Sequence, residues 1–160
     1  MKNKLGLNIG NLLFVERSIV NLKMNLLDEY FTFNQNIFSL EYLKQLHKFL
    51  FSDIYYDDQI ETREFSVAEE SYIKSLLDML KDACLNNSEE IDNVLQPIEA
   101  IWDLQPFYNG NTRTCFAYLC ILNKAFYLNI NIDLNKEIES CSLMFKKENF
   151  VNQKRLTKIK

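Results

Sequence analysis

The sequence predicts an all-α protein with a single domain. Its 160 residues suffice for one hydrophobic core but not comfortably for two. The 48% of hydrophobic residues provide ample material for that core, while three glycines and two prolines are too few for the turns of a β-sandwich or barrel. Apolar residues also recur every three or four positions, which is the spacing of one helix face. No repeat or low-complexity stretch divides the chain, so we assign residues 1–160 to one domain.

Two helical patterns occupy the first third of the chain. The first covers about residues 11–30 and carries a stripe of apolar side chains. The second follows Ser39, a favourable N-cap residue, and ends at about Phe51. The next stretch, 55–65, is rich in charged and aromatic residues and is predicted to be a loop or short hairpin. The apolar stripe of the first helix comprises Leu12, Val15, Ile19, Leu22, Leu26 and Tyr30.

Four further helices are predicted after this stretch. Ser66 and Glu69 have the spacing of a capping box, in which each side chain accepts a backbone N–H of the other residue. Ser88 is expected to cap the next helix, and Pro97 to kink it because proline lacks an N–H group. The helix after that is apolar on almost every side, as a buried helix would be. These helices cover about residues 67–85, 91–102, 115–128 and 134–145.

Charge and hydropathy exclude several classes of protein. A net charge of −4 argues against a nucleic-acid binder, and the basic tail 146–160 is best explained as a solvated terminus. No apolar run reaches the roughly 18 residues of a membrane span, and no signal-peptide core follows the first residues. Four cysteines without C-x-x-C spacing indicate buried reduced thiols. We therefore expect a soluble cytoplasmic protein, with export into a host cell left open.

One tight turn lies between two apolar stretches. Residues 105–113 read Gln-Pro-Phe-Tyr-Asn-Gly-Asn-Thr-Arg and contain one of the two prolines and one of the three glycines. The Gly-Asn pair opens a buried helix, whose first N–H groups have no partner inside the helix. They lie where the helix dipole is positive, an arrangement that binds anions and most often phosphate. An ordinary turn between helices would also explain the Gly-Asn pair by itself.

The turn resembles the signature of the Fic family (filamentation induced by cyclic AMP), which reads His-Pro-Phe-x-(Asp/Glu)-Gly-Asn-Gly-Arg-x-x-Arg. The positions that agree are Pro106, Phe107, Gly110, Asn111 and Arg113. Gln105 replaces the His, Asn109 the acid, Thr112 the second Gly and Phe116 the last Arg. Segments 3–6, 43–55 and 70–73 are also similar to Fic sequences, so the resemblance covers nearly the whole chain.

The resemblance implies a Fic fold of five to six helices with a short β-hairpin flap at about residues 60–66. It also implies a protein adenylyltransferase, which transfers AMP from ATP to a hydroxyl group of a target protein. In such an enzyme the histidine removes the hydroxyl proton and the acid holds Mg²⁺. The flap holds the target protein by strand pairing. Carried over to this chain, the residues that would contact the nucleotide are Phe107, Gly110, Asn111, Thr112 and Arg113.

Two departures from the signature affect the catalytic groups. Gln105 stands in the place of the general base, and a neutral carboxamide cannot take up a proton near pH 7. A polar residue without a role in catalysis would explain Gln105 equally well. Asn109 can offer an amide oxygen to Mg²⁺ but no negative charge, so it is at most a weak metal ligand. The one histidine of the chain, His47, is interpreted as a packing or surface residue of the second helix.

The remaining departures affect the phosphate site. Thr112 places a β-branched side chain where a phosphate would approach the backbone, and Phe116 places a core residue where a cation is expected. Arg113 is predicted either to bind phosphate oxygens in a bidentate way or to form a salt bridge to Asp103 or Glu99. The core is also the better interpretation for Phe107 when its residue type is considered alone.

Two functions are compatible with these residues. The first is a pseudoenzyme of the Fic family, with a degenerate adenylyltransferase motif, weak or lost AMP transfer and residual binding of ATP and Mg²⁺. The alternative is a non-catalytic protein-binding module on the same scaffold, antitoxin-like or associated with secretion. A phosphate-transferring enzyme of the Doc type is less well supported, because the base is missing. The expected partners are a target protein at the flap and an antitoxin-like inhibitor protein, with no nucleic acid and no membrane.

Overall fold

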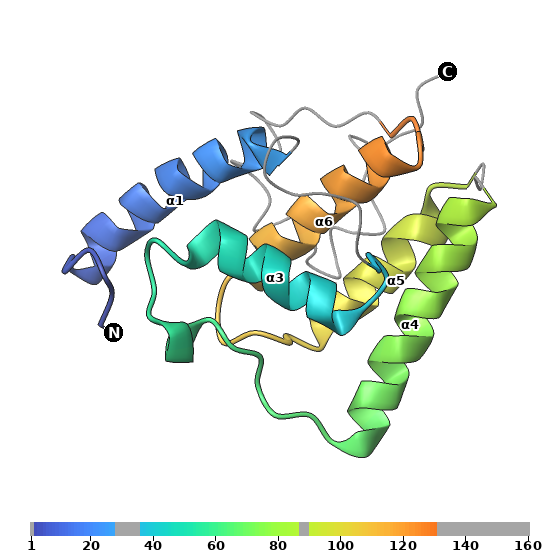
Figure 1. Ribbon diagram of the computed structural model, residues 1–160, viewed down its shortest axis with the longest axis horizontal. Helices are drawn as coiled ribbons and strands as arrows, with labels where there is room; N and C mark the ends of the chain where they lie inside the picture. The colour runs from blue at the N-terminus through green and yellow to red at the C-terminus, as the bar shows by residue number, and fades with distance from the viewer. Residues whose placement is uncertain (1, 28–35, 87–89, 131–160) are drawn as a thin grey trace.

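The computed structural model describes residues 2–27, 36–86 and 90–130. Within these ranges its regular structure is entirely helical, which confirms the predicted fold class (Figure 1). The predicted helix 134–145, the cap Ser88 and the tail 146–160 lie outside the described residues. The helices are α1 (Ile9–Asn25), α3 (Leu40–Phe51), the short 3-10 helix η1 (Asp57–Gln59), α4 (Val67–Leu85), α5 (Asp92–Asp103) and α6 (Asn111–Ala125).

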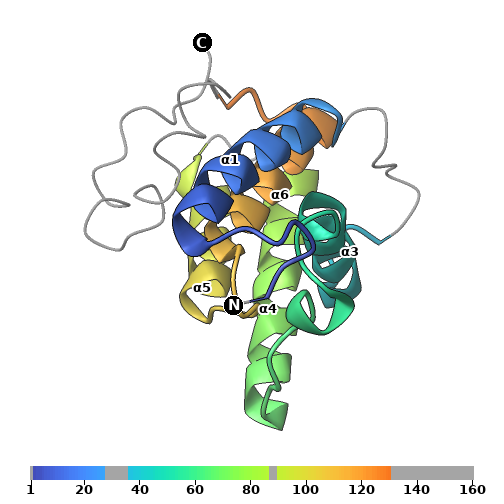
Figure 2. The ribbon, with the colours of Figure 1, turned by 90° about the vertical axis from the view of Figure 1, so that its left-hand side faces the viewer.

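Helix α6 forms the centre of the fold. Every residue from Thr114 to Leu119 is buried, as predicted for a helix that is apolar all round. Helices α3 and α5 pack against α6, α4 packs along α5, and α1 contacts α3. The amino-terminal end of α4 extends beyond the other helices in both views (Figures 1 and 2).

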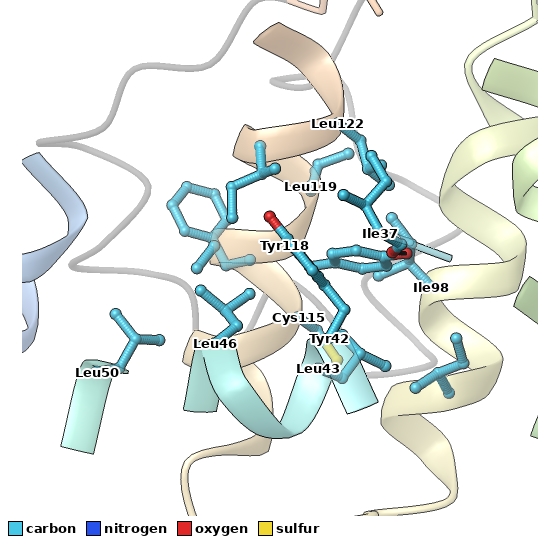
Figure 3. Packing of buried hydrophobic residues seen from close by; sticks show 14 of the residues in the cluster. Ile37, Tyr42, Leu43, Leu46, Leu50, Ile98, Cys115, Tyr118, Leu119 and Leu122 are labelled. Carbon is cyan, nitrogen blue, oxygen red and sulfur yellow. Dashed lines mark hydrogen bonds between the residues drawn. The ribbon is translucent and has the colours of Figure 1, made fainter. Parts of the chain in front are cut away.

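The core lies where α3, α5 and α6 meet. Figure 3 shows Leu46 of α3, Ile98 of α5 and Leu119 of α6 in this cluster, and none of the three side chains has any exposed surface. Burial of one such side chain contributes about 1.5–3 kcal/mol to the free energy of folding. The Tyr118 hydroxyl donates a hydrogen bond to the Ile37 carbonyl, so the polar atom of this buried ring has a partner. This core fixes the position of the amino-terminal end of α6.

The predicted apolar stripe of α1 is confirmed only in part, since Leu12 is buried and Ile19 packs against the core. The buried residues of the helix are Leu12, Glu16, Val20 and Met24, whereas Leu22 of the predicted stripe is 66% exposed. The reason is that the buried face includes the charged residue Glu16, so an apolar pattern alone selects a displaced stripe. The two caps predicted for α3 and α4 are confirmed, because Ser39 and the Ser66 capping box both form their hydrogen bonds.

Segment 60–66 is not confirmed as a hairpin. Its one β-bridge among the described residues is antiparallel and joins Thr62 to Phe107 of the turn. The segment is therefore extended but pairs with the turn instead of with itself. In the described part of the chain, none of the helices has the length and apolar character needed to cross a membrane.

Candidate functional site

Two residues of the turn between α5 and α6 have left-handed backbone conformations. Gly110 has φ 75° and is the N-cap of α6, as its residue type predicts. Gln105 has φ 48°, which is uncommon for a residue with a side chain and was not predicted. The Gln105 side chain turns back to α5, where its Nε2 donates a hydrogen bond to the Trp102 carbonyl (2.7 Å). The residue that replaces the family's histidine thus takes part in the structure of the turn.

The side chain of Asn111 closes the turn from inside. Asn111 is 5% exposed, and its Oδ1 accepts a hydrogen bond from the Phe107 N–H (2.9 Å). Its Nδ2 donates to the Phe107 carbonyl (2.8 Å) and to the Gln105 Oε1 (3.1 Å). The predicted contact of Asn111 with a nucleotide would therefore have to come from its backbone N–H, because the turn itself uses the side-chain amide.

His47 of α3 packs against the turn and binds its backbone. Its ring is fully buried, stacks on the Phe107 ring at 4.0 Å, and its Nε2 lies 2.9 Å from the Asn109 carbonyl. Burial lowers the pKa of His47 to about 4, although the carbonyls of Asn109 and Ile60 raise it in part. The ring is therefore neutral at pH 7 and donates from Nε2. The packing interpretation of His47 is confirmed. The Phe107 ring lies in the core, and the nucleotide contact predicted for this residue stays a prediction.

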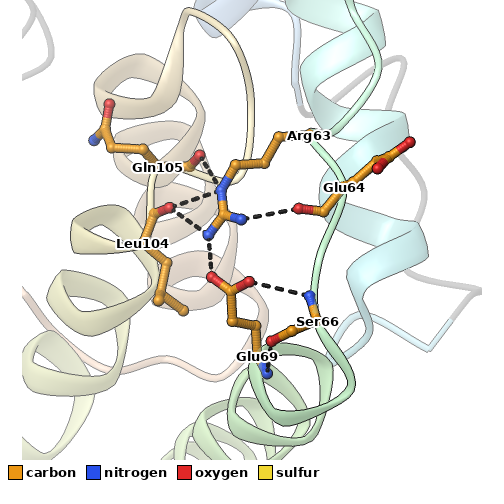
Figure 4. Close-up of polar contacts among 6 residues, drawn as sticks. All are labelled: Arg63, Glu64, Ser66, Glu69, Leu104 and Gln105. Atoms are coloured by element: carbon orange, nitrogen blue, oxygen red, sulfur yellow. Dashed lines mark hydrogen bonds and ion pairs between the residues drawn. The ribbon is translucent and has the colours of Figure 1, made fainter.

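Arg63 joins the extended segment 60–66 to the turn (Figure 4). Its guanidinium donates to the carbonyls of Leu104 (3.0 Å) and Gln105 (3.2 Å), and its backbone N–H donates to the Pro106 carbonyl (2.9 Å). The same guanidinium forms an ion pair with Glu69 of α4 (2.6 Å) and lowers the pKa of that carboxyl to about 2. One side chain therefore binds the carboxyl end of α5, the turn and the first turn of α4.

A shallow pocket of about 260 Å³ lies over the turn. Gly110 has no side chain that could cap α6, and the first bond inside the helix runs from the Thr114 N–H to the Gly110 carbonyl (3.0 Å). The N–H groups of residues 111–113 precede this bond, so they are available to an anion. The residues that line the pocket are Glu16, Gln105, Tyr108, Asn109, Gly110, Asn111, Thr112 and Arg113.

The cation of the pocket is already paired. Arg113 Nη1 lies 2.9 Å from Oε1 of Glu16, and both side chains are mostly buried. The other carboxylate oxygen of Glu16 accepts a hydrogen bond from the Tyr55 hydroxyl (2.6 Å). The salt bridge that we expected for Arg113 therefore exists, but its partner is on α1. Binding of an anion at Arg113 has to displace or tolerate this carboxylate.

The other signature positions differ in what they can still do. The Thr112 hydroxyl accepts a hydrogen bond from the Trp102 indole (2.9 Å), so it ties α6 to α5. Phe116 is 1% exposed and belongs to the core, as predicted. The side-chain oxygen of Asn109 is buried without a hydrogen-bond partner. No group of three His, Cys, Asp or Glu residues suitable for a metal exists in the described ranges.

The comparison with protein families agrees with this architecture. The sequence model of the Fic/DOC family matches residues 37–122, which is more than half of the chain, and the chain belongs to this family. No curated protein matches the chain. The matched range contains α3, the segment 60–66 and the turn. It does not contain α1, so the carboxylate that pairs with Arg113 comes from outside the matched range.

Sequence reasoning missed three residues of the site. Glu16 was overlooked because it was placed off the predicted apolar stripe of α1, and Tyr108 because the signature leaves its position undefined. Arg63 was treated only as part of a flap. A charged residue with helical spacing to Leu12 and Val20 was the one available signal for Glu16.

The titration of His47 makes stability depend on pH. The pKa is about 4 in the folded protein and about 6.5 in an unfolded chain, so the unfolded state binds more protons between these values. We expect the free energy of unfolding to fall by about 2–3 kcal/mol as the pH drops through this window. Urea denaturation at a series of pH values measures this change in the free energy of unfolding. His47→Gln keeps a donor but does not titrate, and an equally steep fall in that variant would contradict the assignment.

Substitution of Gly110 should disrupt the turn. The added methyl carbon of Gly110→Ala would lie 2.5 Å from Phe51 Cε2 and 3.2 Å from His47 Nε2, in a backbone conformation that is already unfavourable for alanine. We expect a loss of about 2–4 kcal/mol in urea denaturation. Gly10→Ala, in the first turn of α1 and with only Asn8 Oδ1 nearby at 3.8 Å, is the matched control and should cost nothing. Equal denaturation midpoints for the two variants would show that the packing at Gly110 is loose.

Proposed function

We propose that this Fic/DOC protein binds the phosphate end of a nucleotide, ATP in the first instance, in the pocket over residues 105–113. The observation that supports this most strongly is the pocket itself, which lies over the first N–H groups of a buried helix with a glycine N-cap. Backbone N–H groups at a helix start favour phosphate. They do not distinguish one base from another, so the nucleotide base is not specified by this contact.

We further propose that AMP transfer to a protein hydroxyl is weak or lost. Gln105 cannot act as a general base, and general-base catalysis typically contributes about 10²- to 10⁴-fold in rate. The Gln105 amide is also bound to the Trp102 carbonyl and to Asn111, so it is not free to orient a hydroxyl. Asn109 can offer Mg²⁺ a single neutral oxygen, which supports weak binding of the metal at most.

A second candidate function is a non-catalytic module that binds a protein partner. The observation that favours it is that the polar side chains of the turn satisfy one another. Asn111, Gln105 and Thr112 all have partners inside the domain, and Arg113 is paired with Glu16. A turn that is complete without a ligand suits a scaffold. In both functions the partner or target protein docks at the extended segment 60–66.

Nucleotide titration tests the proposal. Removing the negative charge with Glu16→Gln keeps a hydrogen-bond acceptor for Tyr55 but releases Arg113, so ATP affinity should rise about 5- to 10-fold, which is about 1–1.4 kcal/mol. Isothermal titration calorimetry with ATP, with and without Mg²⁺, measures this. The double variant Glu16→Gln with Arg113→Gln should lose this gain in ATP affinity. Glu70→Gln, on the exposed face of α4, should leave the ATP affinity unchanged.

The outcomes separate the two functions. No ATP binding by the wild type and by Glu16→Gln would overturn the nucleotide site and favour the protein-binding module. Transfer of label from ATP to protein by the wild type would contradict the role assigned to Gln105. A restored enzyme should be tested as Gln105→His with Asn109→Glu. Phe116→Arg is unsuitable, because it would bury an unpaired charge in the core.

A further inference from the structure

A second recess lies between α3 and the extended segment. Its volume is about 460 Å³, larger than that of the pocket over the turn, and the two share no lining residue. Helix α3 forms one wall, and η1 with the start of the segment forms the other. The lining residues are Lys44, Lys48, Asp57, Ile60, Glu61 and Thr62.

The two walls of this recess carry opposite charges that do not neutralise each other. Lys44 and Lys48 are one helical turn apart, so both project from the same face of α3. Asp57 and Glu61 belong to the opposite wall. In the described part of the chain none of these four groups lies within 4.0 Å of an oppositely charged one, since the ion pairs found there join other residues. An occupant therefore meets two ammonium groups on one side and two carboxylates on the other.

The recess also borders an unused strand edge. The Arg63 N–H donates to the Pro106 carbonyl across the bridge between Thr62 and Phe107. In an extended chain the backbone groups of successive residues point to opposite sides, so the N–H and C=O of Thr62 point away from the turn. Neither group makes a hydrogen bond to another described residue. An unpaired edge of this kind accepts a further extended chain.

We propose that the recess binds an extended segment of the partner protein that carries an acidic and a basic side chain two residues apart. This inference rests on the proposed docking of a partner at residues 60–66 and adds the charge pattern that the partner must present. Side chains two residues apart in a strand point to the same face, about 7 Å from each other. The acidic one meets Lys44 and Lys48, and the basic one meets Asp57 and Glu61, while the backbone pairs with Thr62.

Model peptides test the charge pattern. The probe is a fluorescein-labelled ten-residue peptide with alternating glutamate and lysine on one face and threonine on the other. Two matched peptides carry only glutamate or only lysine on the charged face. Fluorescence anisotropy should show at least about 5-fold tighter binding of the mixed peptide, and its affinity should fall with added salt. Equal binding of all three peptides, or of none, would overturn the proposal.

Variants of the protein test the location. Lys44→Gln with Lys48→Gln should weaken binding of the mixed peptide at least about 5-fold, whereas Lys74→Gln with Lys81→Gln removes the same charge from α4 and should not. Thr62→Pro removes the outward N–H but leaves the Arg63 bond to the turn in place, and it should abolish binding.

ATP affinity measured on the same preparations separates this proposal from the nucleotide site. The double variant Lys44→Gln with Lys48→Gln and the single variant Thr62→Pro are compared with the wild type. If both variants bind the peptide like the wild type, the recess is not the peptide site, whatever the result with ATP. If these variants lose the peptide but keep the ATP affinity of the wild type, the recess is confirmed independently of the turn.

Discussion

The contact between His47 and the turn is the interaction on which the site depends. One buried imidazole stacks on Phe107 and donates to the Asn109 carbonyl, and the Gly110 backbone lies directly against the ring of Phe51 beside it. These contacts hold the turn against α3 at the point where α6 begins. The direction of the first N–H groups of α6 follows from this placement. A neutral histidine serves here because it combines an apolar stacking surface with one donor.

The turn is organised without a ligand, and this shapes what it can bind. Asn111 uses its whole amide to close the turn, and Gln105 and Thr112 are tied to Trp102. What remains for a ligand is the set of backbone N–H groups, because the side-chain oxygen of Asn109 has no hydrogen-bond partner but is buried. Because the cation of Arg113 is neutralised by Glu16, the attraction for phosphate rests mainly on the helix dipole and these N–H groups.

Much of the fold could be predicted from the sequence because its signals are local. Ser39 and Ser66 cap helices where their spacing indicated, and the apolar stretch after the turn is the buried helix α6. The features that could not be predicted depend on residues far apart in the chain. Glu16 and Arg113 are separated by 97 positions, and no local pattern pairs them.

The hairpin predicted for segment 60–66 was not confirmed for a similar reason. A hairpin prediction considers only the pairing of a stretch with itself, whereas Thr62 finds its partner at Phe107. The left-handed backbone conformation of Gln105 could not be predicted either, because it is stabilised by Arg63, which is distant in the sequence.

That stabilisation explains how a residue with a side chain is kept in an unfavourable conformation. A left-handed non-glycine residue costs of the order of 1–3 kcal/mol. Arg63 donates to the Leu104 carbonyl, which belongs to the peptide bond before Gln105, and to the Gln105 carbonyl, which belongs to the peptide bond after it. The donor of these bonds is the residue adjacent to Thr62. The backbone that borders the recess on α3 and the backbone that forms the pocket over α6 are thus held by the same guanidinium.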